Sequence, residues 1–114
     1  MSYVDGFLLP LPKKNLAAYN KMAKLGRKMW LAAGALDYKE CVGDDLSPAW
    51  ALPFPKQMKL KKGEVPVFSF ITYKNRKHRD AVNKKVMAGM TDMPKDMPFD
   101  MKRMAYGGFT VLVE

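Results

Sequence analysis

An apolar stretch from Val65 to Tyr73, which runs directly into a basic amphipathic helix ending near Gly89, has the clearest hydrophobic pattern in the chain. Successive side chains of an extended strand point to opposite faces. One face would carry Val67, Ser69, Ile71 and Tyr73, and the opposite face would carry Phe68, Phe70 and Thr72. Because both sets are mostly apolar, we expect both faces of this strand to be buried.

The chain begins with a predicted strand and a predicted helix. Apolar residues alternate over 2–11, and Pro10 and Pro12 are expected to end this strand, because proline cannot donate a hydrogen bond to a neighbouring strand. Apolar residues then recur at every third or fourth position over 13–33. This spacing predicts a helix, and Gly34 is expected to close it as a C-terminal cap.

A second strand is predicted over 36–42, where apolar residues alternate with polar or small ones. Such a mixed strand is typical of a sheet edge. The following segment, 44–56, is rich in proline and carries Trp50 and Phe54. We interpret it as an ordered loop or lid.

The second half of the chain contains the remaining predicted elements. Residues 56–60 and the strand from Val65 flank the four-residue sequence KKGE, which predicts a hairpin. Asn75 is the expected N-cap of the helix that follows. Two prolines interrupt 90–103, and the last predicted strand is 104–113.

The resulting order is strand, helix, strand, strand, helix, strand. Uncrossed connections and right-handed crossovers make this an α+β fold, a ferredoxin-like βαββαβ split sheet with both helices on one face. We expect one domain over residues 1–114. The uncovered sheet face is predicted to pair with its counterpart in a homodimer. The alternative is that the loop around Trp50 and Phe54 folds back over this face in a monomer.

The composition is typical of a globular protein, with 48% hydrophobic and 27% charged residues. The apolar runs are too short for a membrane span, and the first residues do not resemble a signal peptide. Cys41 is the only cysteine, so no internal disulfide can form. We therefore expect a cytoplasmic protein without a membrane partner.

The net charge of +9 falls mainly on the two helices. If both helices lie on one face of the sheet, that face is basic, and we assign to it Lys21, Lys24, Lys28, Arg76 and Arg79. A basic face of this kind can bind RNA or another polyanion. Because no aromatic residues are interleaved with these cations for base stacking, solvated helix faces are the favoured interpretation.

Asp5 is the first candidate for a ligand-cavity residue. We interpret Gly6 as the point where a helix approaches the first strand closely. Tyr3, Asp5 and Phe7 would then face the partner sheet, and Val4, Gly6 and Leu8 would face the helices. An acid in that apolar setting could hold a polar group of a ligand, with Ser69 or Tyr106 beside it. The alternative is a neighbouring Lys or Arg that makes Asp5 structural.

The remaining candidate residues favour no metal and no cofactor. His78 lies among cations at the start of a helix, where a histidine is more often solvated than a haem ligand. Cys41 lacks a catalytic partner in the sequence, and a lone thiol usually packs in the core. The methionines with helical spacing are Met90, Met93, Met97, Met101 and Met104. Because Pro94 and Pro98 break any continuous helix there, core filling is favoured over a Cu(I) site.

Four segments, SYVDGFLLP, ECVGDD, KNRKHRDAVNKKVM and MPFDMKRMAYGGF, resemble the YbaA-like bacterial family, a domain of unknown function, and the match covers nearly the whole chain. The resemblance implies a ferredoxin-like member of the dimeric α/β-barrel superfamily. That superfamily includes antibiotic-biosynthesis-type and haem-degrading monooxygenases and small isomerases, which use the cavity between paired sheets. No catalytic residue carries over to this chain, because the family has no established activity.

These observations together predict a homodimer that binds or converts a small molecule in the cavity between its paired sheets. By the resemblance, any conversion would be monooxygenase-like, and the residues themselves favour one without a metal. The sequence leaves open whether the protein is an enzyme. Polyanion or RNA binding through the basic helical face is the alternative function.

Overall fold

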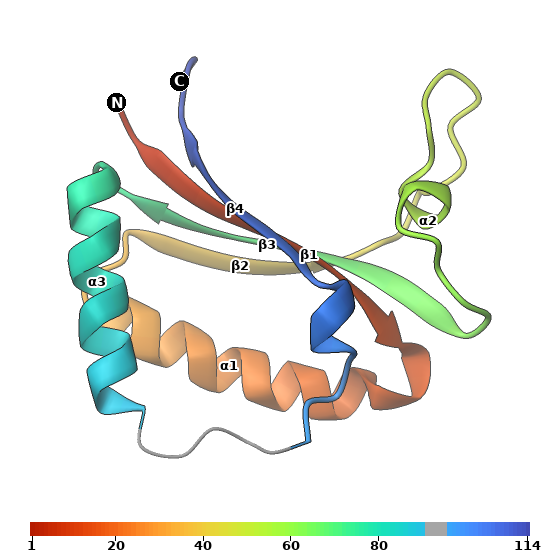
Figure 1. The fold of residues 1–114 in the computed structure, drawn as a ribbon, viewed down its shortest axis with the longest axis horizontal. Helices are drawn as coiled ribbons and strands as arrows, with labels where there is room; N and C mark the ends of the chain where they lie inside the picture. The colour runs from red at the N-terminus through yellow and green to blue at the C-terminus, as the bar shows by residue number, and fades with distance from the viewer. Residues whose placement is uncertain (91–95) are drawn as a thin grey trace.

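The structure is a computed structural model and describes residues 1–90 and 96–114. Its elements are β1 (Tyr3–Pro12), η1 (Lys13–Asn15), α1 (Leu16–Ala32), β2 (Asp37–Val42), α2 (Phe54–Gln57), β3 (Glu64–Tyr73), α3 (Arg76–Gly89), η2 (Met101–Arg103) and β4 (Ala105–Thr110). The strands form an antiparallel sheet in the order β2-β3-β1-β4. Both long helices, α1 and α3, lie on the same side of this sheet (Figure 1). The predicted α+β, ferredoxin-like arrangement is therefore confirmed.

The first strand agrees with the predicted range 2–11 and ends at Pro12 as expected, but Pro10 does not end it. Pro10 lies opposite Pro66 of β3 in the antiparallel ladder. The carbonyl of Pro66 accepts a hydrogen bond from Gly43 at 2.9 Å, on the side away from β1. The two prolines therefore form a pair that needs no N–H donor from either residue.

Glycine and asparagine fix the ends of the long helices as predicted. Gly34 follows α1 with a φ of 115°, a conformation that favours glycine. The side chain of Asn75 accepts a hydrogen bond from the backbone N–H of His78 at 2.8 Å and caps α3. Inside α1, a Cβ at position 26 would lie 2.8 Å from the hydroxyl oxygen of Tyr38, so Gly26 lets β2 pack closely.

The predicted hairpin strand over 56–60 is wrong, because the short helix α2 occupies the start of this segment. Prolines at positions 53 and 55 favour the first turn of a helix over a strand. The preceding loop stands away from the sheet, on the side opposite α1 and α3 (Figure 1). Trp50 is 89% exposed and Phe54 is also exposed. The monomeric alternative requires this loop to fold back over the sheet. The structure shows that it does not.

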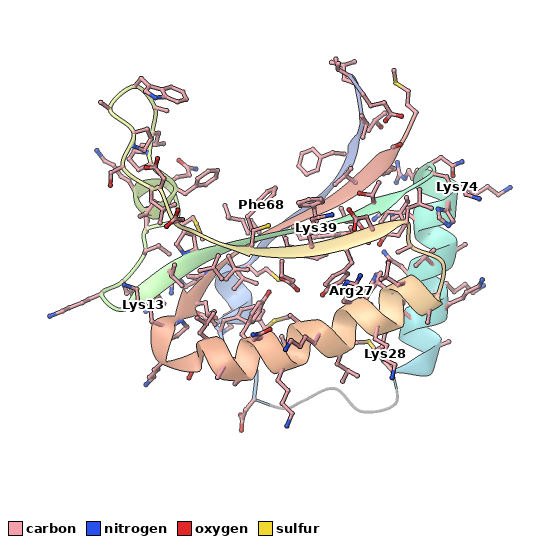
Figure 2. All side chains as sticks on the ribbon, turned by 180° about the vertical axis from the view of Figure 1, so that it is seen from behind. Lys13, Arg27, Lys28, Lys39, Phe68 and Lys74 are labelled. Atoms are coloured by element: carbon pink, nitrogen blue, oxygen red, sulfur yellow. The ribbon has the colours of Figure 1, made fainter. Side chains whose placement is uncertain are left out.

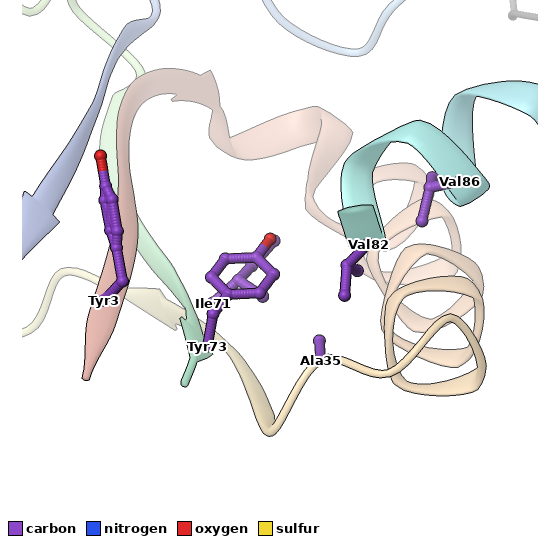
Figure 3. Close-up of a cluster of buried hydrophobic side chains, with 6 residues drawn as sticks. All are labelled: Tyr3, Ala35, Ile71, Tyr73, Val82 and Val86. Atoms are coloured by element: carbon purple, nitrogen blue, oxygen red, sulfur yellow. The ribbon is translucent and has the colours of Figure 1, made fainter. Parts of the chain in front are cut away.

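Two clusters of buried side chains fill the space between the sheet and the helices. The first, next to α3, contains Tyr3, Ala35, Ile71, Tyr73, Val82 and Val86 (Figure 3). The second, next to the start of α1, contains Leu9, Leu11, Tyr19, Ala23, Val67 and Phe99. Of the two predicted faces of β3, the one with Ile71 and Tyr73 therefore meets the helices.

The other face of the sheet, which we call the open face, is not covered by α1 or α3. Its apolar side chains include Val4, Leu8, Phe68, Phe70 and Phe109. Phe68 is 48% exposed and Phe109 is 62% exposed. Figure 2 shows Phe68 on the side of the sheet away from α1. The strand with two apolar faces is thus buried by helices on one face only.

The chain exposes more surface than a compact monomer of its mass. Its accessible surface is 8270 Å², whereas about 6,300 Å² is typical of a 12.9 kDa monomer. The radius of gyration is 15.0 Å, compared with about 13 Å for a compact domain of this length. Part of the difference comes from the loop before α2 and from the chain ends, which project on the side of the open face (Figure 1).

Candidate functional site

Asp5 lies on the helix-covered face, so the prediction that it faces a partner sheet is wrong. Its ladder partner is Ile71 of the first apolar cluster, and Asp5 is 1% exposed. The orientation of the strand was predicted from Gly6, which was interpreted as the contact with a helix. The group that approaches Gly6 is instead the ring of Phe109, which lies on the open face. A Cβ at position 6 would lie 3.3 Å from that ring.

Arg79 of α3 connects Asp5 to two tyrosines. Its Nη1 lies 3.3 Å from Oδ1 of Asp5 and donates to the hydroxyl of Tyr106 at 2.7 Å, and its Nη2 donates to the hydroxyl of Tyr3 at 3.3 Å. Its Nε lies 2.9 Å from the carboxylate of Asp80 without the alignment of a hydrogen bond. The side chain of Arg79 is only 14% exposed. The assignment of Arg79 to the solvated basic face is therefore wrong.

The hydroxyls of Tyr73 and Tyr106 near this ion pair stay protonated at ordinary pH. Burial, followed by the charge of Asp5, raises the pKa of Tyr106 and also that of Tyr73. Burial by itself would lower the pKa of Arg79, but the charge of Asp5 opposes this effect and the pKa is raised overall. Asp5 and Arg79 thus form a charged pair that anchors α3 on the sheet. This is the structural alternative considered for Asp5.

The sequence interpretation did not identify a second carboxylate on the helix-covered face. Glu40 of β2 accepts hydrogen bonds from the hydroxyls of Tyr19 at 2.6 Å and Tyr38 at 2.8 Å. Its ladder partner is the buried Ser69. Burial and then Glu40 raise the pKa of both tyrosines. The signal in the sequence was an acid at an apolar position of the alternating strand 36–42.

The structure places Asp5, Ser69 and Tyr106 on one face, but it is the helix-covered face. Phe7 is the ladder partner of both Ser69 and Tyr106, and its ring centroid lies 4.8 Å from that of Tyr106. Two shallow pockets of the described part of the chain have volumes of about 370 and 470 Å³, and neither is lined by these three residues. The three predicted residues therefore line neither pocket.

The smaller pocket lies on the open face beside α2, and we call it the α2 groove. It is lined by Leu8, Gln57, Met58, Lys59, Arg103 and Ala105. Leu8 and Ala105 are ladder partners on β1 and β4. The groove is shallow and open on one side. It is a concave feature that adjoins the uncovered apolar face.

Two cations lie at the α2 groove in different electrostatic settings. Arg103 donates to both carboxylate oxygens of Glu64, at 2.7 and 2.8 Å, and to the carbonyl of Lys59 at 3.2 Å. Lys59 has a left-handed φ of 53°, which costs a residue other than glycine about 1 kcal/mol. Its ammonium group has no hydrogen bond or ion pair among the described residues. Lys59 is thus the cation available to a ligand in the groove.

Replacing Glu64 with glutamine is expected to destabilise the fold by about 1 kcal/mol at neutral pH. Arg103 holds the pKa of Glu64 at about 2, below its ordinary value of 4.5, although burial acts in the opposite direction. A lowered pKa in the folded state stabilises the protein above the unfolded pKa. The difference between wild type and variant in urea unfolding should therefore shrink between about pH 4.5 and about pH 2. A difference that is constant over this range would contradict the assignment.

His78 and Cys41 differ from their predicted settings. The Nδ1 of His78 accepts a hydrogen bond from the backbone N–H of Lys74 at 3.0 Å, and its ring packs edge-on against Tyr73. His78 is therefore a structural contact at the start of α3 and not simply solvated. Cys41 is exposed on the open face, opposite Phe68 in the ladder, and does not pack in the core.

Three of the four methionines of the predicted series that lie in the described residues pack in the core, as expected. Met90 packs against the first apolar cluster, and Met97 and Met104 pack against the second; Met101 is exposed. Met93 and Pro94 lie outside the described residues. Within residues 1–90 and 96–114, no group of three His, Cys, Asp or Glu side chains could hold a metal ion.

The other residues of the predicted basic face, Lys21, Lys24, Lys28 and Arg76, are exposed. Figure 2 shows Arg27 and Lys28 on α1, away from the open face. Exposed cations on the outer side of two helices agree with the solvated interpretation. None of the helices in the described ranges has the length and apolar character needed to cross a membrane.

Comparison with known proteins places this geometry in a family. A family described as "Protein of unknown function (DUF1428)" matches residues 2–101. The uncharacterised protein YbaA of Escherichia coli K12 and that of Shigella flexneri are each 37% identical over 116 residues, covering 100% of this chain and 99% of theirs. The predicted resemblance to the YbaA-like family is confirmed.

Among solved structures, a dimeric ferredoxin-like protein from an uncultured marine organism superposes with a TM-score of 0.57. The alignment covers 100% of this chain and 99% of that protein at 14% sequence identity. This likeness confirms the ferredoxin-like fold.

Proposed function

The chain belongs to the DUF1428 family of proteins of unknown function, and we propose that it is a homodimer in which the partner sheet closes the α2 groove over a small apolar anion. The position of the groove at the border of an uncovered apolar sheet face carries this proposal. Pairing of two open faces would convert the shallow groove into an enclosed cavity. The predicted cavity between sheets is retained, but with residues other than Asp5, Ser69 and Tyr106.

The surface of the chain supports the pairing. Its accessible surface exceeds that of a typical compact monomer by about 2,000 Å². A stable homodimer of ordinary size buries about 800 Å² on each partner. The uncovered Phe68 and Phe109 are the kind of side chains that such an interface buries. The structural neighbour described as a dimeric ferredoxin-like protein agrees with this arrangement.

The lining of the groove suggests the class of ligand. Leu8, Met58 and Ala105 offer an apolar wall, and Lys59 offers a cation without a protein partner among the described residues. An apolar body with a carboxylate, sulfonate or phenolate group matches this combination. No His, Cys, Asp or Glu is among the residues that line the groove. Binding of a small molecule is therefore better supported than its conversion.

Replacement of Lys59 by methionine is expected to weaken binding of the apolar anion 8-anilinonaphthalene-1-sulfonate about fivefold, which corresponds to about 1 kcal/mol. The probe is titrated by fluorescence against wild type and variant, and one site per chain is expected. Lys21→Met is the matched control, because Lys21 is exposed on α1, and it should bind as the wild type does. Equal affinities for all three proteins would contradict the proposed site.

Polyanion binding through the helices is the weaker candidate function. It depends on Lys21, Lys24, Lys28 and Arg76, but Arg79 is withdrawn from that surface by its contact with Asp5. Exposed cations of this kind are also what solubility requires. No aromatic platform for bases accompanies them on the described helix surfaces.

A further inference from the structure

Two groups of exposed apolar side chains lie at opposite ends of the open face. The first, which we call the loop tip, consists of Trp50, Leu52 and Phe54. The second, which we call the C-terminal arm, is residues 109–113 with Phe109, Leu112 and Val113. Trp50 is 89%, Leu112 82% and Val113 86% exposed. The loop before α2 and the C-terminal segment, which carry these side chains, lie on the side of the sheet away from the helices (Figure 1).

The open face alone is too small for a stable dimer. The edge strands β2 and β4 have 6 residues each. With strands about 4.8 Å apart and about 3.3 Å per residue, the 6 residues of each edge strand and the 10 residues of each central strand, β1 and β3, give a flat area of about 510 Å². A stable dimer buries about 800 Å² on each partner. Further contact area has to come from the segments that project beyond the sheet, which are the loop tip and the C-terminal arm.

The C-terminal arm is held in place although its side chains are exposed. The backbone N–H of Val111 donates to the carbonyl of Ser2 at 2.9 Å. The backbone N–H and the hydroxyl of Ser2 also lie 3.3 and 3.2 Å from the carboxylate of Glu114. The arm therefore presents Leu112 and Val113 in a fixed position. A surface that is ordered before binding loses less conformational freedom when it meets a partner.

From these observations, and resting on the homodimer proposed above, we propose that the loop tip of each chain binds the C-terminal arm of the other chain. A two-fold axis that lies between the sheets and runs across the strands brings opposite ends of the two chains together. Each loop tip then meets an arm of the partner, and the contact occurs twice. The occupant of the loop tip is thus a second copy of this chain.

This contact would also complete the α2 groove. The last residue of α2 and the two residues after it, Gln57, Met58 and Lys59, line the groove. A partner arm that packs against the loop therefore lies next to the groove and covers it with Leu112 and Val113. The site is incomplete in a single chain because its roof comes from the partner.

Cysteine cross-linking tests the arrangement. Trp50→Cys and Leu112→Cys are made as separate proteins, each in a Cys41→Ser background, and are mixed, allowed to exchange subunits and oxidised gently. Non-reducing electrophoresis then measures covalent dimers, and sedimentation equilibrium of the wild type is run in parallel. The control mixture pairs Trp50→Cys with Leu25→Cys, because Leu25 is exposed on α1.

The expected result is a disulfide-linked dimer in the first mixture only, with no link in either single variant or in the control mixture. Self-linking of Trp50→Cys alone would place two loops together and would overturn the proposal. If the wild type is a dimer but the first mixture gives no link, the contact between loop tip and arm is overturned, while the proposed homodimer stands. A monomeric wild type would overturn both.

Discussion

Replacing Asp5 with leucine is expected to lower the free energy of unfolding by about 3 kcal/mol. The carboxylate of Asp5 is almost completely buried, and its ion-pair partner Arg79 is only 14% exposed. Removing the carboxylate leaves the guanidinium under α3 without its buried counter-charge. The cost is measured by urea unfolding followed by circular dichroism. If Asp5→Leu is as stable as the wild type, Asp5 is not the anchor of α3.

Two further variants separate the buried pair from the other contact of Arg79. Asp80→Asn should cost less than about 1 kcal/mol, because the side chain of Asp80 is 61% exposed. The double variant Asp5→Leu with Arg79→Met should recover most of the lost stability, since apolar side chains can replace a buried ion pair. A double variant as unstable as Asp5→Leu would show that the loss does not come from an unpaired guanidinium.

Replacing Phe68 with lysine is expected to weaken the homodimer roughly a hundredfold in Kd, or about 3 kcal/mol. Phe68 is 48% exposed in the single chain, so the lysine can be solvated in the monomer and folding should be unchanged. In a two-fold interface the substitution buries two like charges near each other. Light scattering over a dilution series, with circular dichroism as the folding control, measures this effect.

Met87→Lys is the matched control for Phe68→Lys. Met87 is also a large exposed apolar residue, but it lies on α3, on the other side of the sheet. The control variant should remain dimeric. If both variants dissociate equally, general charge repulsion and not the open face explains the result.

The order of elements could be predicted from the sequence because several local signals agreed. The apolar periodicity of 13–33 covers the residues that form α1. Gly34 lies just after the end of α1, and Asn75 is the N-cap of α3. The alternation of β3 correctly identified a strand with two apolar faces. The short helix α2 was missed because four residues are too few to establish a helical period.

The orientation of the first strand could not be predicted from its own residues. Both of its faces contain apolar side chains, and Gly6 is equally compatible with a neighbouring helix or a neighbouring ring. The register decides the question, because Asp5 pairs with Ile71 and Tyr3 pairs with Tyr73 on the helix-covered face. The α2 groove likewise depends on the meeting of α2 with β1 and β4, which the local pattern of neither segment indicates.

Sedimentation equilibrium of the wild-type protein at micromolar concentration tests the pairing of open faces most directly. One chain has a mass of 12.9 kDa, and the proposed homodimer predicts a mass twice that of the chain over the accessible concentration range. The Phe68→Lys variant, run in the same buffer, should sediment as a single chain. A wild-type protein with the mass of one chain at these concentrations would contradict the account.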